Sequence, residues 1–378
     1  MLIINVKILT MDNKDYENGY IHINGSKIIE IGEMQRAPND NDVYDAEGGY
    51  AIPGMIDAHC HLGVFGDSLG FEGEDGNENP DPSAQHLRII DAINPLDRCF
   101  EDARNAGVTT VVVSPGSANA LGGQIVAVKT NGIRVDNIIV KEPLAVKVAF
   151  GENPKTVHNE KNQSPTTRMA TASMIRQALF NAQDYIKKEN KETCLKNEAL
   201  SRVLNNEIPL HAHAHRADDI FTAIRIAKEF KIDVKIVHGT EAHLIAEELA
   251  KDNIDVMVGP SLSDRSKPEL TNLTFVTAAI LERAGVRVAL VTDHPVVPIN
   301  YLLLTAQLAV KNGMTEYGAL RAITIDAAGI SGIDDKVGKL AKGYDADIAI
   351  FDKNPMEFTS IIKQVIIGGV KIDKPNNG

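Results

Sequence analysis

Two histidines separated by a single residue follow the first long apolar stretch of the chain. They are His59 and His61. On an extended strand, residues i and i+2 point to the same face, so both imidazoles could bind one metal ion at about 2.0–2.1 Å. A His-x-His pair alone is a weak signal. This pair, however, ends an apolar run that would open a barrel, and barrel active sites lie at the carboxyl ends of the strands. We therefore expect a metal ion here.

Three later apolar runs also end in residues that can bind a metal ion. Each of these residues alone could be a packed histidine or a helix cap, but that explanation would have to hold at every strand end. A ring of nitrogen and oxygen ligands suits zinc, iron, manganese or nickel better than calcium. The residues are His211, His213 and His215 after Ile208–Leu210, His238 after Val234–Val237, and Asp293 and His294 after Val286–Val291.

Short apolar runs alternate with amphipathic segments between residues 51 and 342. This alternation is typical of repeated βα units around a parallel sheet, and eight such runs predict an α/β fold with a TIM-like (β/α)8 barrel. One amphipathic segment has Ile220, Ile224 and Ala227 at helical spacing. The predicted strands are Ala51–Asp57, Thr109–Val113, Ile125–Val128, Ala145–Phe150, Ile208–Leu210, Val234–Val237, Asp255–Val258 and Val286–Val291.

The two ends of the chain both read as short β segments. Residues 1–50 contain apolar runs rich in Ile and Val, and residues 343–378 contain Ala346–Phe351 and Val365–Gly368. Neither set could readily form a stable sheet alone. We therefore predict that they pair into one small β-sandwich module, composite in sequence, beside the barrel. An acidic, glycine-rich stretch, Gly66–Pro82, is expected to be a long solvated loop.

Composition narrows the classes of partner. The 378 residues include 39 Lys and Arg against 51 Asp and Glu, a net charge of −12, without a basic stripe. This balance disfavours nucleic acid and anionic lipid, which leaves a small-molecule substrate. Three scattered cysteines indicate free thiols, and the absence of an export signal or an 18-residue apolar run favours the cytoplasm over a membrane. A homodimer is the default oligomer.

The sequence resembles the amidohydrolase superfamily, which includes dihydroorotase, phosphotriesterase, imidazolonepropionase and metal-dependent dipeptidases. The resemblance rests on the junction Pro53–His61, the internal histidine strands, Thr292-Asp293-His294-Pro295 and the closing segment Lys342–Phe351. It covers nearly the whole chain. It implies that His59 and His61 bind one metal ion, which Asp293 also holds while acting as general base.

The resemblance also implies a second metal ion, bound by histidines after the fifth and sixth barrel strands. His238 is the sixth-strand ligand. In imidazolonepropionase-like relatives, the fifth-strand ligand lies about seven residues before the first apolar anchor of the next helix, and counting back from Ile220 gives His213. His211 is the alternative, and His215 would contact a ligand or the substrate.

Two-metal members of the family also need a bridging anion, usually a carboxylated lysine at the end of the fourth strand and sometimes a glutamate. Lys147 and Glu152 both lie in this region. A lysine in an apolar strand is costly to bury unless it is neutralised or paired, which favours carboxylated Lys147. Glu152 lies in the following turn and could instead be a metal ligand or contact the substrate. Relatives with a single metal ion lack the bridge, so the resemblance is compatible with either one or two metal ions.

The resemblance implies metal-assisted hydrolysis of a carbon–nitrogen bond in an amide, a cyclic amide or a dipeptide. Arg168 and Arg216 could pair with a substrate carboxylate, and His294 is a further candidate for substrate contact. An imidazolonepropionase-like ring opening is the alternative, but those relatives carry an acid where this chain has Arg216. A metal-binding scaffold without activity is the alternative of another class, which the complete set of ligands disfavours.

Overall fold

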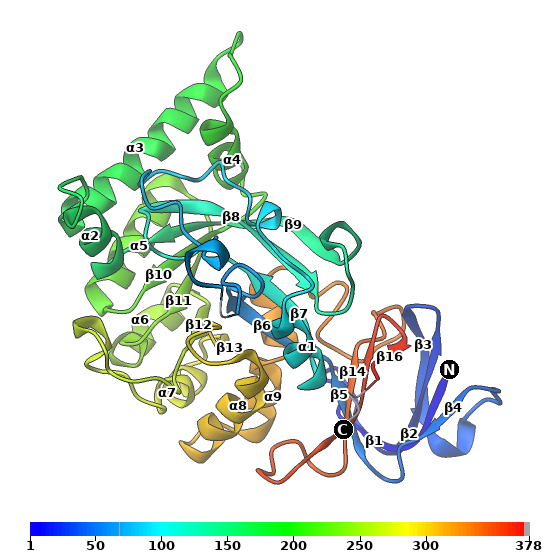
Figure 1. Cartoon of the computed structure of the whole chain (residues 1–378). Helices are drawn as coiled ribbons and strands as arrows, with labels where there is room; N and C mark the ends of the chain where they lie inside the picture. The colour runs from blue at the N-terminus through cyan, green and yellow to red at the C-terminus, as the bar shows by residue number, and fades with distance from the viewer. Residues whose placement is uncertain (68, 374–378) are drawn as a thin grey trace.

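The strands of the protein form two eight-stranded sheets. We describe residues 1–67 and 69–373 of a computed structural model. One sheet is a nearly closed barrel, and the other lies beside it and contains strands from both chain ends (Figure 1). The predicted α/β barrel fold is therefore confirmed. The barrel strands in chain order are β6 (Met55–Cys60), β7 (Val108–Val113), β8 (Leu121–Lys129), β9 (Ile139–Ala149), β10 (Leu210–Ala214), β11 (Val234–His238), β12 (Val256–Val258) and β13 (Val288–Leu290).

One barrel strand departs from the predicted parallel arrangement. β8 pairs antiparallel with both β7 and β9, while the other neighbouring strands pair in parallel. The expectation of βα units throughout is wrong at this point. A parallel connection needs a crossover of a dozen or more residues, and the chain between Val113 and Leu121 is too short for one. The barrel is brought close to closure by backbone hydrogen bonds from Asp293 to His59 (3.3 Å) and from His61 to His294 (2.9 Å).

Two strand boundaries also differ from those expected. The single predicted strand Ala51–Asp57 is interrupted at Gly54, so that its first half joins the other sheet and its second half becomes β6. A side chain at Gly54 would lie 2.2 Å from the Thr109 hydroxyl, which explains the glycine. The predicted strand Ile208–Leu210 instead begins at Leu210 and runs to Ala214, so two candidate histidines lie within β10 rather than after it.

The second sheet, called the terminal sheet below, is the form that the predicted β-sandwich module takes. Hydrogen bonds join it into one continuous sheet, and β14 from the C-terminal region pairs antiparallel with β5. The domain boundaries at residues 50 and 343 stay a prediction. The strands in sheet order are β16 (Val370–Lys371), β15 (Ile362–Ile367), β14 (Ile348–Phe351), β5 (Tyr50–Pro53), β1 (Leu2–Ile8), β2 (Tyr16–Asn24) and β3 (Lys27–Glu33), while β4 (Val43–Asp45) pairs with β1.

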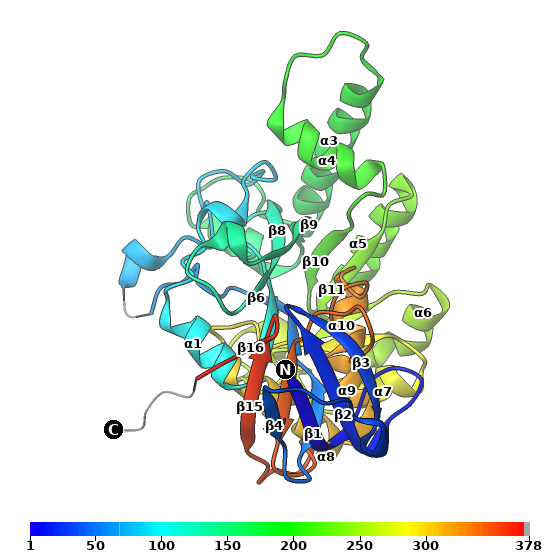
Figure 2. The same ribbon diagram turned by 90° about the vertical axis from the view of Figure 1, so that its right-hand side faces the viewer.

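The helices pack mainly around the barrel. In α5 the residues Ile220, Ile224 and Ala227 are buried, as their spacing predicted. Figure 2 shows α3 and α4 projecting from the end of the molecule opposite the terminal sheet. Among the described residues, no helix combines the length and the apolar content needed to cross a membrane. The helices are α1 (Arg98–Asn105), α2 (Glu152–Asn159), α3 (Arg168–Lys187), α4 (Leu195–Leu204), α5 (Ala217–Phe230), α6 (Ala246–Lys251), α7 (Thr277–Arg283), α8 (Leu302–Lys311), α9 (Glu316–Ala322) and α10 (Ile325–Ile330).

Two groups of ion pairs hold the elements together away from the barrel mouth. Lys129, at the end of β8, donates to Asp345 at 2.8 Å and to Asp347, which joins the barrel to the terminal sheet. At the amino ends of three neighbouring barrel strands, Asp255 accepts hydrogen bonds from Lys235 at 2.7 Å and Arg287 at 2.5 Å. Residues at the amino ends of barrel strands contribute to stability rather than to catalysis.

Candidate active site

The carboxyl ends of β6 and β13 bring two histidines and an aspartate together. Oδ1 of Asp293 lies 3.4 Å from Nε2 of His59 and 3.2 Å from Nε2 of His61. This carboxylate oxygen is buried and has no hydrogen-bond partner among the described residues. A buried oxygen without a partner is costly, and a metal ion between it and the two imidazoles would satisfy it.

A fourth residue, Asp57, fixes the backbone around this group. Its buried carboxylate accepts hydrogen bonds from the His59 amide (3.1 Å), the Thr292 amide (3.1 Å) and the Thr292 hydroxyl (2.5 Å). Burial raises the pKa of Asp57 to about 7, although the hydrogen bonds lower it. The carboxylate thereby ties the first barrel strand to the segment that carries Asp293. Asp293 itself adopts a left-handed backbone (φ 54°), a strained conformation that is common at functional sites.

A second group of potential ligands lies next to the first. One ring nitrogen from each of His213, His215 and His238 lies within 4.8 Å of the other two. His238 also belongs to the group formed with His59 and Asp293, and its ring centroid lies 5.5 Å from that of His59. The two groups therefore share one imidazole. This arrangement could hold one metal ion or two neighbouring ions.

The rings of His61 and His238 are oriented so that Nε2 can bind a metal ion. Nδ1 of His61 donates to the Ser114 carbonyl and Nδ1 of His238 to the Gly259 carbonyl, each at 2.7 Å. Because a carbonyl only accepts, each hydrogen bond fixes the proton on Nδ1 and leaves a lone pair on Nε2. Burial also lowers the pKa of His238 to about 4. Neutral imidazoles with free Nε2 atoms, together with a carboxylate, fit a zinc-type ion.

Burial also shifts the pKa values of the other titratable groups in the site. The pKa values of His59, His213 and His215 fall well below their ordinary range, chiefly because their rings are buried. Burial raises the pKa of Asp293, but the contacts with His238, His59 and His61 lower it by more, so this pKa lies well below its ordinary value. The site therefore combines neutral imidazoles with an ionised carboxylate.

Lys147 on β9 reaches the same place from the interior of the barrel. Its side chain is fully buried, and Nζ lies 3.3 Å from Nε2 of His59. Burial lowers its pKa to about 8, although Asp293 opposes the change. His211, the alternative fifth-strand ligand, is the β10 residue in register with Lys147. Both its ring nitrogens are buried without a hydrogen-bond partner in the described part of the chain, and it belongs to neither group of potential ligands.

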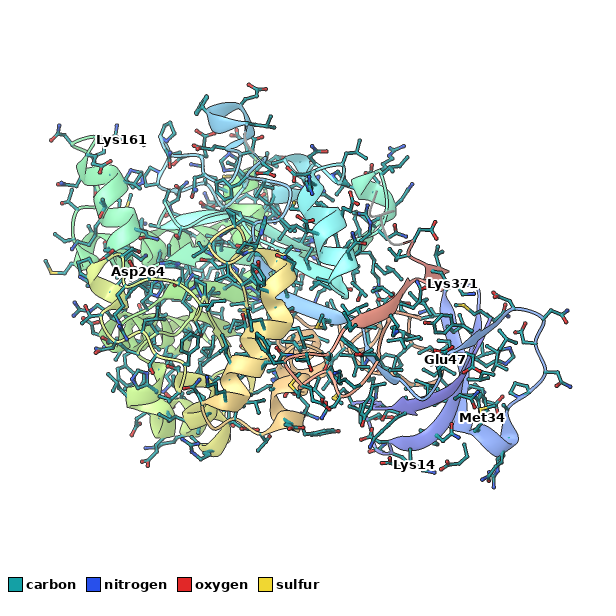
Figure 3. The ribbon with its side chains drawn as sticks, turned by 60° about the horizontal axis from the view of Figure 1, so that its bottom comes forward. Lys14, Met34, Glu47, Lys161, Asp264 and Lys371 are labelled. Atoms are coloured by element: carbon teal, nitrogen blue, oxygen red, sulfur yellow. The ribbon has the colours of Figure 1, made fainter. Side chains whose placement is uncertain are left out.

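The site opens into a cavity of about 560 Å³. Its walls include His61, Lys147, His213, His238 and Asp293. Asp264, on the loop after β12, also lines the cavity and lies at the opposite end of the molecule from Glu47 and Lys371 (Figure 3). His61, His238 and Asp293 lie at or just after the carboxyl ends of their barrel strands. The cavity is therefore at this end of the barrel, as expected for this fold. Its volume suits a small molecule.

Four other predicted site residues lie outside this cavity. Arg168 donates to buried Asp219 at 2.9 Å, and Arg216 pairs with Asp218 on the surface at 2.9 Å. Nδ1 of His294 accepts a hydrogen bond from the Ile299 amide at 3.2 Å. Glu152 begins α2, and its amide donates to Glu269 at 3.1 Å. None of the four predicted residues is among the described residues that line the cavity, and the two arginines already have carboxylate partners.

Sequence reasoning missed Asn153 and Lys267, which line the cavity, and Glu269, which lies behind them. Lys267 donates to Asn153 at 3.0 Å and to Glu269 at 2.9 Å. Glu269 is almost fully buried, and its Oε1 lies 3.7 Å from Nε2 of both His213 and His215. Lys267 and Glu269 lie in the loop between β12 and α7, and loops after barrel strands carry active-site residues. That rule could have drawn attention to this loop, whose residues do not stand out by type.

The chain is similar to several known proteins. The model of the Amidohydrolase family matches residues 50–372. Amidohydrolase tasK of Hapsidospora irregularis is 28% identical over 93% of this chain, which spans only 39% of that protein. Imidazolonepropionase of Colwellia psychrerythraea is 23% identical, with 93% of this chain and 91% of that protein covered. The crystal structure of an amidohydrolase from Thermotoga maritima MSB8 superposes with a TM-score of 0.95 and 39% identity, over 99% of this chain and 100% of that one.

These matches agree with the resemblance that the histidine motifs indicated. The family model covers most of the chain, and the Thermotoga maritima structure shares the fold over its whole length. The chain therefore belongs to the amidohydrolase family of hydrolases.

Proposed function

We propose that this protein is a metal-dependent hydrolase that uses metal-activated water to break an amide, cyclic amide or dipeptide-like bond of a small molecule. The observation that carries the proposal is the pair of ligand groups that share His238 at the mouth of the barrel. Buried Asp293 Oδ1 has no other partner among the described residues, and the groups open into a cavity large enough for a small substrate. Amidohydrolases act on carbon–nitrogen bonds, and an amide-type bond is one of these.

The donor atoms divide naturally between two ions. His59, His61 and Asp293 would hold one divalent ion, and His238 with His213 or His215 would hold the other. Zinc is the first choice for these nitrogen and oxygen donors, and iron, manganese and nickel are alternatives. When bound, such an ion lowers the pKa of a coordinated water from 15.7 toward about 7, which supplies hydroxide at neutral pH.

Asp293 would act as the general base and acid. Its carboxylate is ionised and faces the cavity, so it can accept a proton from the attacking water. The same carboxylate would then deliver the proton to the leaving nitrogen, which makes the amine a better leaving group. Asp57 would keep this carboxylate in position through Thr292.

Lys147 is the better candidate for the bridging group. Its amine lies beside His59 in the barrel interior, and its lowered pKa increases the neutral fraction that can react with carbon dioxide. Carboxylation would convert a buried cation into an anion among imidazoles. Glu152 begins a helix, and its side chain is not among the described groups at the cavity.

An imidazolonepropionase-like ring opening remains the second candidate because such an enzyme is similar over most of this chain. The acid that those relatives carry is replaced by Arg216, which pairs with Asp218 away from the cavity. We therefore place amide or dipeptide hydrolysis first. A screen that contains N-acyl amino acids, dipeptides and cyclic amides, with an imidazolone among the cyclic compounds, distinguishes the two.

Metal analysis and one substitution test the proposal. Protein expressed with added metal should contain a divalent ion and hydrolyse at least one class in the screen. Asp293→Asn should lower kcat at least about a hundredfold, as loss of a general base does. Asp184→Asn, on the exposed face of α3, is the control and should keep full activity. A metal-free protein, or full activity of Asp293→Asn, would overturn the proposal.

A further inference from the structure

The wall of the cavity carries a cation that the proposed chemistry does not use. Among the described residues that line the cavity, only Lys147 and Lys267 are lysines or arginines. Lys147 lies at the base beside His59, whereas the Lys267 side chain is 27% exposed on the wall. A cation that is open to the cavity can contact a substrate, so its surroundings indicate which substrate group it would meet.

The Lys267 ammonium is held in place from two sides. It donates to Oδ1 of Asn153 at 3.0 Å and to Oε1 of Glu269 at 2.9 Å. Both partners are themselves fixed, since Asn153 donates to the Ser117 hydroxyl at 2.7 Å and Glu269 accepts from the Glu152 amide. An ammonium group has three hydrogens, and two are used. The third is available for an acceptor in the cavity.

Glu269 also sets the position of Lys267 relative to the proposed metal ligands. Its Oε1 contacts the ammonium at 2.9 Å and lies 3.7 Å from Nε2 of His213 and of His215. One Glu269 oxygen thus lies between the ammonium and the two imidazoles beside which the scissile carbonyl would bind. In an N-acyl amino acid, the carboxylate lies about one residue length, 3.3–3.6 Å, beyond the scissile bond. The spacing suits a carboxylate on the carbon bonded to the scissile nitrogen.

The two predicted carboxylate-binding residues do not compete for this role. Arg168 and Arg216 do not line the cavity, whereas Lys267 does while it is paired with Glu269. We propose that Lys267 binds the free carboxylate of the leaving amino acid, so that the substrates are dipeptides or N-acyl amino acids. This inference rests on the proposed function and names the substrate class for the same site.

Matched substrates test the proposal directly. A series of alanine dipeptides and the same peptides with C-terminal amides differ only in the carboxylate charge. A charge-assisted hydrogen bond predicts that wild-type kcat/KM is about tenfold to a hundredfold higher for the free acids. Lys267→Met should remove that preference, mainly by raising KM for the free acids to the KM of the amides.

Two further variants separate substrate binding from a structural role. Lys267→Arg keeps a cation and should retain part of the preference, and Lys187→Met, on the exposed end of α3, should behave as wild type. Equal hydrolysis of acids and amides by the wild type, or an equal loss on both series in Lys267→Met, would overturn this inference alone. Metal-loaded wild type that cleaves no compound of any class in the wider screen would overturn the proposed function with it.

Discussion

Lys129 links the barrel to the terminal sheet, and we predict that Lys129→Met will lower the free energy of unfolding by about 3–5 kcal/mol. The lysine side chain is 15% exposed, and that of Asp347 is 4% exposed. Methionine fills most of the space but carries no charge. Asp345 keeps its contact with Lys27 at 2.7 Å, so the loss falls chiefly on Asp347, which would be buried without a cation.

The cost of this substitution should depend on pH. Burial already raises the pKa of Asp347 above its ordinary value, and Lys129 opposes that rise. Without Lys129 the pKa will rise further. A carboxyl whose pKa is raised in the fold binds more protons folded than unfolded, so stability falls as pH rises from the unfolded pKa, about 3.9, through the folded one. The variant should therefore lose less stability in mild acid than at neutral pH.

Urea unfolding followed by circular dichroism at about pH 7 and about pH 5 measures both effects, within the window where the Asp347 carboxyl would titrate. Arg134→Met is the control, because Arg134 pairs with Asp136 on the surface, where water screens the pair, and the variant should be as stable as the wild type. A loss below about 1 kcal/mol for Lys129→Met at neutral pH would refute the reasoning about burial. An equal loss at both pH values would refute the reasoning about protonation.

Three other predictions concern stability. Asp255→Asn should cost about 3 kcal/mol in urea unfolding at neutral pH, whereas Asp252→Asn, on a surface pair, should cost less than about 1 kcal/mol. The pKa of Asp255 is lowered because, although burial raises it, Arg287 and Lys235 lower it more, so the Asp255→Asn difference should shrink below about pH 4. Fully buried Phe351→Ala should cost about 3–5 kcal/mol, against about 0.5 or less for Phe71→Ala, which is 89% exposed. Removal of metal by a chelator should lower the thermal midpoint and added zinc should restore it, while an unchanged midpoint would argue against a bound ion.

The strands that carry the proposed ligands could be predicted because neighbouring residues in the sequence determine how these side chains are arranged. An alternating pair such as His59 and His61 fixes its own common face, and a histidine directly after a run of β-branched residues, such as His238, lies at a strand end. The barrel followed from the same rhythm of apolar runs. In these places, local sequence and tertiary structure impose the same arrangement.

The rest of the site depends on contacts between residues that are distant in the sequence. Arg216 forms an ion pair with a surface aspartate two residues away, and Arg168 forms one with Asp219 from another helix. Lys267 lies in an irregular loop, and only the folded chain brings it to Asn153 and Glu269. No periodicity marks such a loop residue, so its side chain could not be assigned to the cavity from the sequence.

The break at Gly54 has a practical consequence for anyone who divides this protein into parts. β5 is hydrogen-bonded on one edge to β1 and on the other to β14, and after a single residue the chain enters the strand that carries His59. Truncation before residue 348 would remove the hydrogen bonds of β14 to one edge of β5. The strand that carries His59 would then be held less firmly. Expression of residues 51–342 alone would therefore yield a catalytic core with an unsupported first strand.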